Sequence, residues 1–192
     1  NYHGYEIIAG ISIAILVSRV ISLIGSTSSF ILMPYFSDLF NKNRVNEVID
    51  SYKEIRSINT SLIIPLFTLI ITYSKQILSL IGQEYNQYNL ILIIICTGSI
   101  FPIILGPNGT VILMTKSFKK EINSGLILIC TFLIISLLFG SINILIIPFA
   151  FALAEILASF YKAYIVKKIF NFSLDDILFT KILLAISLNF IL

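Results

Sequence analysis

Long apolar runs, separated by short polar connections, constrain the fold of this chain more than any other feature of its sequence. Five of them cover residues 6–35, 58–81, 88–115, 123–140 and 143–166, and a sixth begins at residue 178 and reaches residue 192. A helix needs about 20 mostly apolar residues to cross a bilayer. Because the runs lack the short alternating segments of a transmembrane β-barrel, the sequence predicts an all-α polytopic transmembrane helix bundle. We expect about five complete spans and a truncated sixth.

The composition excludes an ordinary soluble protein. Apolar residues make up 57% of the chain and charged residues only 12%, whereas soluble domains carry about 25% charged residues. The mean hydropathy is +0.98, so much of the apolar surface must face lipid. The net charge of +3 comes from basic residues placed between the apolar runs, and we therefore expect membrane lipid and no nucleic acid as a partner.

The basic residues alternate between consecutive connections, which predicts an orientation. Three connections are rich in Lys and Arg, at residues 42–56, 116–120 and 162–176, whereas those near Lys75 and Ser141 are poor in both. Cytoplasmic connections carry the excess of Lys and Arg in membrane proteins. The three basic connections are therefore predicted to be cytoplasmic and residue 1 to lie outside.

One segment, residues 43–58, differs from the spans. Val45, Val48, Ile49, Tyr52 and Ile55 recur at helical spacing, and charged residues occupy the opposite face. This pattern predicts an amphipathic helix on the cytoplasmic surface that continues into the second span. The rest of residues 1–192 forms one membrane domain. The chain begins with Asn and ends inside an apolar run, so we expect the C-terminal bundle of a longer transporter.

Arg19 is a candidate binding residue because it lies near the middle of the first span, where a charge is costly. Ser12, Ser22, Ser26 and Ser29 fall within about 100° of arc around it, at 100° per helical residue. Such a face can border a hydrated cavity, where a guanidinium binds phosphate or carboxylate. The alternatives are a structural ion pair or a bond to backbone carbonyls of a broken neighbouring helix.

Glu155, inside the fifth run, is the candidate ion-coupling residue. It can serve as a counter-ion for Arg19, as a cation or proton site, or as a simple partner of Lys162. In the third run, Gly106, Pro107 and Gly109 predict an interrupted helix, which is either a transporter hinge or a packing kink.

No catalytic centre is evident in the sequence. It has no cluster of metal ligands, no nucleophile with a neighbouring His and no phosphate-binding loop of the Walker type, and its connections are short. Cys96 and Cys130 both lie within apolar runs and are expected to be small buried hydrophobic residues. We therefore expect no metal, no cofactor and no enzymatic activity.

The order of several short motifs resembles the C-terminal half of the polysaccharide flippases. These motifs are MPYFSDL at residues 33–39, LIIPL at 62–66, LIGQEY at 80–85, TG at 97–98, GPNG at 106–109 and ILMT at 112–115. This family exports O-antigen, capsule or teichoic-acid units and belongs to the multidrug/oligosaccharidyl-lipid/polysaccharide exporter superfamily. Its members commonly have about twelve to fourteen spans in two bundles.

The resemblance implies that the chain moves isoprenoid-pyrophosphate-linked oligosaccharides across the bacterial cytoplasmic membrane, with the missing N-terminal half of the same chain as the second bundle. It implies that Arg19 binds the anionic head and that Ser22, Ser26 and Ser29 bind sugar or water. Two other functions stay open: a multidrug or cation antiporter of the same superfamily, which needs an acid such as Glu155, and a polytopic polysaccharide polymerase.

Overall fold

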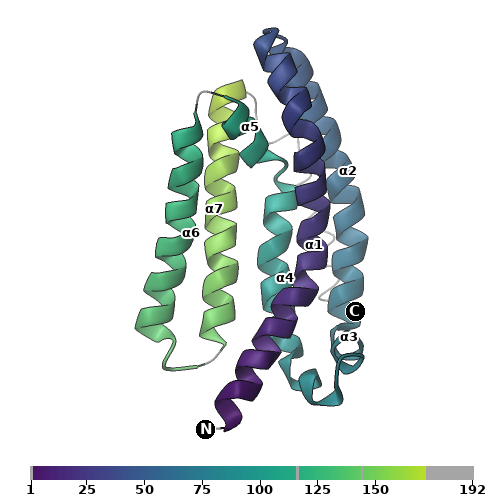
Figure 1. Cartoon of the computed structure of the whole chain (residues 1–192), viewed down its shortest axis with the longest axis vertical. Helices are drawn as coiled ribbons and strands as arrows, with labels where there is room; N and C mark the ends of the chain where they lie inside the picture. The colour runs from purple at the N-terminus through teal and green to yellow at the C-terminus, as the bar shows by residue number, and fades with distance from the viewer. Residues whose placement is uncertain (1, 116, 144, 172–192) are drawn as a thin grey trace.

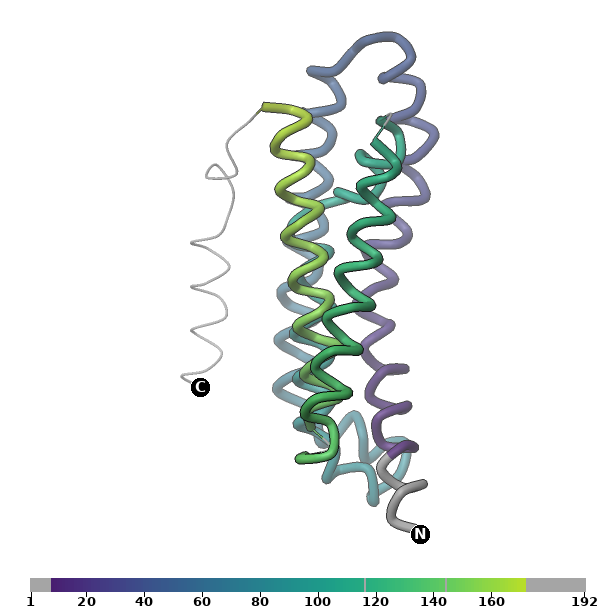
Figure 2. Tube along the Cα trace, turned by 90° about the vertical axis from the view of Figure 1, so that its left-hand side faces the viewer, coloured from purple at the N-terminus to yellow at the C-terminus, as the bar shows by residue number. Residues whose placement is uncertain are grey.

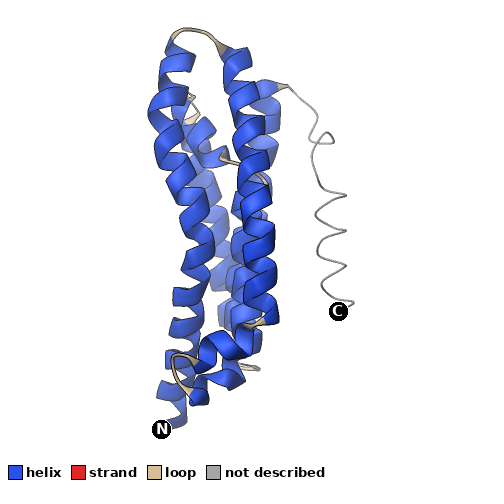
Figure 3. Ribbon diagram, turned by 90° about the vertical axis from the view of Figure 1, so that its right-hand side faces the viewer, coloured by secondary structure: helices blue, strands red, loops and turns tan. Residues whose placement is uncertain are grey.

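The computed structural model describes residues 2–115, 117–143 and 145–171, with the backbone alone for residues 2–7. In these residues helices joined by short loops make up the chain and no strand is present (Figure 3), which confirms the predicted all-α fold. The elements are α1 (Tyr2–Asn41), α2 (Val45–Thr72), α3 (Ser74–Ser79), the 3-10 helix η1 (Gln83–Tyr88), α4 (Asn89–Ile104), α5 (Asn108–Met114), α6 (Phe118–Phe139) and α7 (Ile146–Phe170).

Within the described part of the chain, five stretches of helix are long and apolar enough to cross a membrane. They are Ile8–Asn41, Val45–Thr72, Gln83–Ile104, Phe118–Phe139 and Ile146–Phe170. The chain is therefore a multi-pass membrane protein. The predicted sixth span, at residues 178–192, lies outside the described residues.

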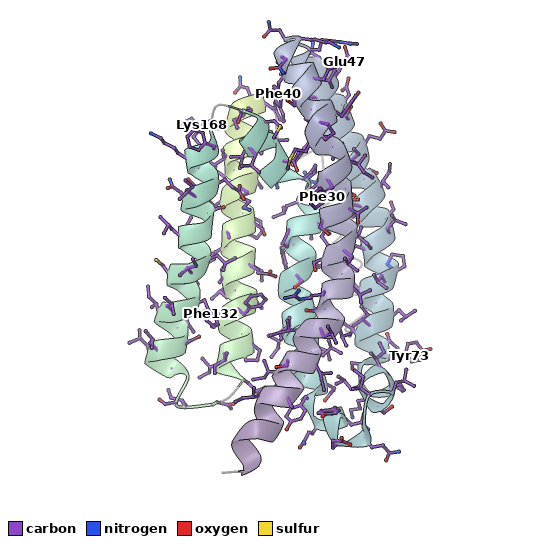
Figure 4. All side chains as sticks on the ribbon, in the orientation of Figure 1. Phe30, Phe40, Glu47, Tyr73, Phe132 and Lys168 are labelled. Carbon is purple, nitrogen blue, oxygen red and sulfur yellow. The ribbon has the colours of Figure 1, made fainter. Side chains whose placement is uncertain are left out.

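The long helices run up and down in one bundle. α4 lies in its middle and contacts α1, α2 and α7, and α6 packs along α7 at the outer edge (Figures 1 and 2). The hairpin of α1 and α2 extends beyond the ends of α5, α6 and α7 (Figure 1). Glu47 and Lys168 lie at this end of the bundle and Tyr73 at the other (Figure 4), so the basic connections gather at one end.

Apolar burial and small residues explain why α4 is central. Leu92, Ile95 and Ile100 are almost completely buried in a cluster shared with α1 and α2. α4 also packs closely against α7: a Cβ atom on Gly98 of α4 would lie 2.5 Å from the Cα atom of Ala152 of α7. Small residues permit such contact between membrane helices. By contrast, only 6% of the apolar stretch of α6 is buried, so this helix is largely exposed at the edge of the bundle.

The second predicted span begins earlier than expected. α2 is continuous from Val45 to Thr72, so the predicted amphipathic segment at residues 43–58 supplies its first turns. Val48 and Tyr52 are buried in a cluster with Phe36 and Val166. Their face continues along the helix at spacings of three and four residues, through Arg56, Asn59, Ile63, Phe67 and Ile70. This unbroken face explains why the segment packs on the protein; its cytoplasmic location stays a prediction.

Candidate functional site

A cleft of about 340 Å³ lies between the helices of the bundle, with polar side chains set in an otherwise apolar lining; we call it the polar cleft for these side chains. Its walls come from α1, α2, α4, α5, α6 and α7 and from the segment that joins α4 to α5. The lining residues are Ser22, Gly25, Ser26, Ser29, Asn59, Ser99, Pro102, Ile103, Gly106, Pro107, Asn108, Gly109, Leu128, Glu155, Ala158, Ser159 and Lys162. Hydroxyl, amide and charged groups thus gather where a purely structural helix bundle would place apolar side chains.

The serine face of α1 forms one wall, and Ser22, Ser26 and Ser29 all line the cleft. Each hydroxyl donates its proton to a carbonyl of its own helix: Ser22 to Arg19 at 2.9 Å, Ser26 to Leu23 at 3.1 Å and Ser29 to Gly25 at 2.9 Å. A serine oxygen keeps acceptor lone pairs after donating its proton. This wall can therefore accept hydrogen bonds from the hydroxyl groups of a ligand.

Arg19 and Ser12 are placed differently from these three serines. Both are exposed, and neither lines the cleft. Arg19 precedes Ser22 by nearly one turn and is rotated by about 70° from the middle of the lining face, at 100° per residue. The structure therefore brings the serines together without Arg19, and a role of Arg19 in anion binding stays a prediction.

The interruption predicted in the third run is present. α4 ends at Ile104 and α5 begins at Asn108, and Gly106 between them has a positive φ of 97°. A Cβ atom at Gly106 would lie only 2.9 Å from the hydroxyl oxygen of Tyr52. Glycine is needed here for its backbone conformation and for this close approach. Gly106, Pro107 and Gly109, the predicted hinge residues, all border the cleft.

Buried polar side chains from α2 hold the carbonyl groups at the end of α4. Arg56 is 3% exposed, and its Nε donates to the Ile104 carbonyl at 2.8 Å. The hydroxyl of Tyr52 lies 2.8 Å from both the Leu105 carbonyl and Oδ1 of Asn108. Nδ2 of Asn108 also donates to the Leu105 carbonyl, at 3.0 Å. Carbonyls at a helix end lack partners within the helix, so this network makes a break inside a membrane span possible.

Arg56 was not predicted to be a site residue, because it falls in a connection whose basic residues are expected to be cytoplasmic. Arg56 takes the role of binding the carbonyls of a broken neighbour, which was one alternative for Arg19. The signal was present in the spacing of Val48, Tyr52, Arg56 and Asn59, which continues the apolar face of the second span.

Glu155 reaches the cleft from α7, and its carboxyl group neighbours Ser99. Its Oε2 atom is buried and has no hydrogen-bond partner. No salt bridge joins Glu155 to Arg19 or to Lys162, all three of which are described; Lys162 instead pairs with Glu121 of α6. Of the alternatives for Glu155, the two ion pairs are therefore wrong, and the cation or proton site stays a prediction.

The described ranges contain no group of three or more His, Cys, Asp or Glu side chains that would hold a metal ion. Comparisons with models of known protein families, with curated proteins and with solved structures found no match to this chain. The inference of function therefore depends on the chemistry of the cleft and on the membrane-spanning bundle around it.

Proposed function

We propose that this protein is a flippase that moves isoprenoid-pyrophosphate-linked oligosaccharides across the bacterial cytoplasmic membrane. The observation that supports this proposal is the polar cleft inside an otherwise apolar bundle. Its volume of about 340 Å³ falls at the lower end of the range of about 300–1,000 Å³ typical of small-molecule sites. A lining of serine and asparagine side chains suits sugar hydroxyls, which both donate and accept hydrogen bonds.

The outer surface of the bundle suits the other part of such a substrate. α6 exposes Leu126, Leu133, Leu137 and Leu138, and an isoprenoid chain can stay in lipid beside such a surface while the sugar occupies the cleft. In this proposal the α4–α5 interruption is the place where the cleft changes shape, because Gly106 and Pro107 line it without belonging to either helix.

The test is the distribution of lipid-linked oligosaccharide between the two leaflets. Deleting the gene in its host is expected to trap lipid-linked repeat units on the cytoplasmic side, with loss of surface polysaccharide. Unchanged lipid intermediates would contradict the proposal and favour the antiporter. Accumulation on the outer side would favour a polymerase.

Filling the cleft should stop transport without disturbing the bundle. Ser26→Leu places a larger apolar side chain in the α1 wall, and we expect it to reduce translocation of a labelled lipid-linked oligosaccharide in proteoliposomes about tenfold or more. The cause is loss of both cleft volume and an acceptor oxygen, at a cost of about 1.5 kcal/mol or more in the transport step.

Ser12→Leu is the matched control for this variant. Ser12 lies on the same helix, is likewise exposed and bonds to its own backbone at 2.8 Å, but it does not line the cleft. Transport by this control should stay normal. Equal losses in the two variants would show that the cleft is not the transport route.

Glu155 favours a second function, that of a multidrug or cation antiporter. A carboxylate oxygen without a partner in a polar cleft is what a cation or proton site requires, and acids within membrane spans commonly serve ion pathways. Drug-resistance profiling discriminates between the two functions: the antiporter predicts that deleting the gene sensitises the host to several unrelated cationic drugs, whereas the flippase predicts no such change.

A further inference from the structure

Lys162 lines the cleft, but its partner does not. The ammonium group of Lys162, on α7, donates to Oε1 of Glu121, which lies in the first turn of α6. Lys162 is among the residues that surround the cleft, and Glu121 is not. The pair therefore joins two neighbouring helices and presents its positive member to the cavity.

The charges around the cleft single out this lysine. Among the described residues that line the cavity, Lys162 is the only base and Glu155 the only acid. Arg19 is exposed elsewhere on α1, and Arg56 bonds the Ile104 carbonyl through Nε and does not line the cleft, although its Nη1 atom is buried without a partner. An anionic group that enters the cleft thus has one cation available to it.

The ion pair leaves part of its bonding capacity unused. Oε2 of Glu121 is buried without a partner, so the carboxylate engages through one oxygen only. The two side chains are 29% and 24% exposed, and an ammonium group has three donors. Beside the pair lies Gly109, which lines the cleft and whose missing Cβ atom would stand 3.5 Å from Oε1 of Glu121 and 3.7 Å from Nζ of Lys162. The lysine therefore borders the cleft with donors that Glu121 does not use.

We propose that Lys162 is the residue that binds the phosphate groups of the transported lipid, and that Glu121 pairs with its ammonium group until the anion arrives. The bound anion shares the ammonium charge with the Glu121 carboxylate and is repelled by that carboxylate, so binding of the anion weakens the link between α6 and α7. This inference rests on the proposed flippase function and names the group that recognises the charged part of its substrate.

The test uses two substitutions with opposite expected effects. Binding of an isoprenyl pyrophosphate to the full chain in nanodiscs should weaken about tenfold or more in Lys162→Gln, because a charge-assisted hydrogen bond is lost. In Glu121→Gln it should strengthen severalfold, because the competing carboxylate is gone. If the ion pair only stabilises the two helices, isoprenyl pyrophosphate should bind more weakly to both variants or equally well to both. Either outcome would overturn the proposal.

Two controls separate phosphate recognition from other effects. Lys168→Gln removes an exposed cation from the same helix, outside the cleft, and should bind normally. Inorganic pyrophosphate should displace the lipid from the unmodified chain and fail to do so in Lys162→Gln at the same concentration. Displacement that is equal in both proteins means that recognition does not involve Lys162, and the proposal is then wrong.

Failure of this inference can be distinguished from failure of the flippase function. If both variants bind and translocate the lipid as the unmodified chain does, the role of Lys162 is excluded while the flippase proposal stands. If the unmodified chain neither binds nor translocates the lipid, both proposals fail.

Discussion

Gly98→Val is expected to disrupt the packing of α4 against α7 and to cost about 3 kcal/mol or more in unfolding free energy. An added Cβ atom would lie 2.5 Å from the Cα atom and 2.8 Å from the Cβ atom of Ala152. The first of these atoms belongs to the backbone, so no change of rotamer relieves the clash and the two helices must separate. Overpacking in a well-packed core typically costs about 1–3 kcal/mol and occasionally more. Because the clash at Gly98 involves the backbone of Ala152, we expect its cost to lie at the upper end of this range.

Unfolding of the purified chain in mixed micelles of increasing SDS content measures this effect, and Gly125→Val is its matched control. Gly125 is also a helical glycine in a span, but nothing lies within 4 Å of its missing Cβ atom. Its replacement should change the unfolding free energy by less than about 1 kcal/mol, because only helix propensity is altered. Similar losses for the two variants would contradict the close contact between α4 and α7.

If the second function, that of an antiporter, holds, Glu155→Gln should abolish the dependence of transport on an ion gradient. Glutamine keeps the shape of the side chain but removes the only acid among the described residues of the cleft. Glutamine neither takes up a proton nor carries the charge that attracts a cation, and a loss of about 1.5–3 kcal/mol weakens affinity about tenfold to a hundredfold. We expect uptake of the transported compound into proteoliposomes, driven by a proton or sodium gradient, to fall by at least this factor. The unfolding free energy of the chain should stay unchanged.

Glu84→Gln is the corresponding control, because Glu84 is exposed in η1 and lies away from the cleft. It should leave gradient-driven transport intact. Gradient-driven transport that persists in Glu155→Gln would remove this residue from the coupling mechanism and with it the observation that favours an antiporter.

The spans and their interruption followed from local sequence. Long apolar runs fold into helices in a bilayer whatever their neighbours are, so the five spans could be located before any packing was known. The break near Gly106 and Pro107 was predictable for the same reason, because glycine and proline alter the backbone wherever they stand. The wall formed by Ser22, Ser26 and Ser29 was likewise visible as one helical face.

The positions of the charged side chains could not be predicted in this way, because they depend on which helices meet. Arg19 was favoured as the residue inside the bundle, yet the packing of α1 places it outside the cleft. Arg56 and Lys162 were assigned to cytoplasmic connections, because basic residues near the end of an apolar run usually lie there. α2 begins before its expected start at residue 58, and the added turns carry Arg56 to the end of α4. Lys162 lies where the fifth apolar run overlaps the basic connection, and the packing of α7 places it at the cleft.

The projecting hairpin of α1 and α2 makes the orientation of the molecule open to direct measurement. α1 has 40 residues and so spans about 60 Å, roughly twice the hydrocarbon thickness of a bilayer. The turn at residues 41–44 consequently stands in water, and its Lys42 and Arg44 are both exposed and suitable for cleavage by trypsin. Protease added outside sealed vesicles will cut this turn only in molecules whose basic end faces outward. The fraction that is cleaved then gives the proportion of each orientation, and with it the direction in which any measured transport runs.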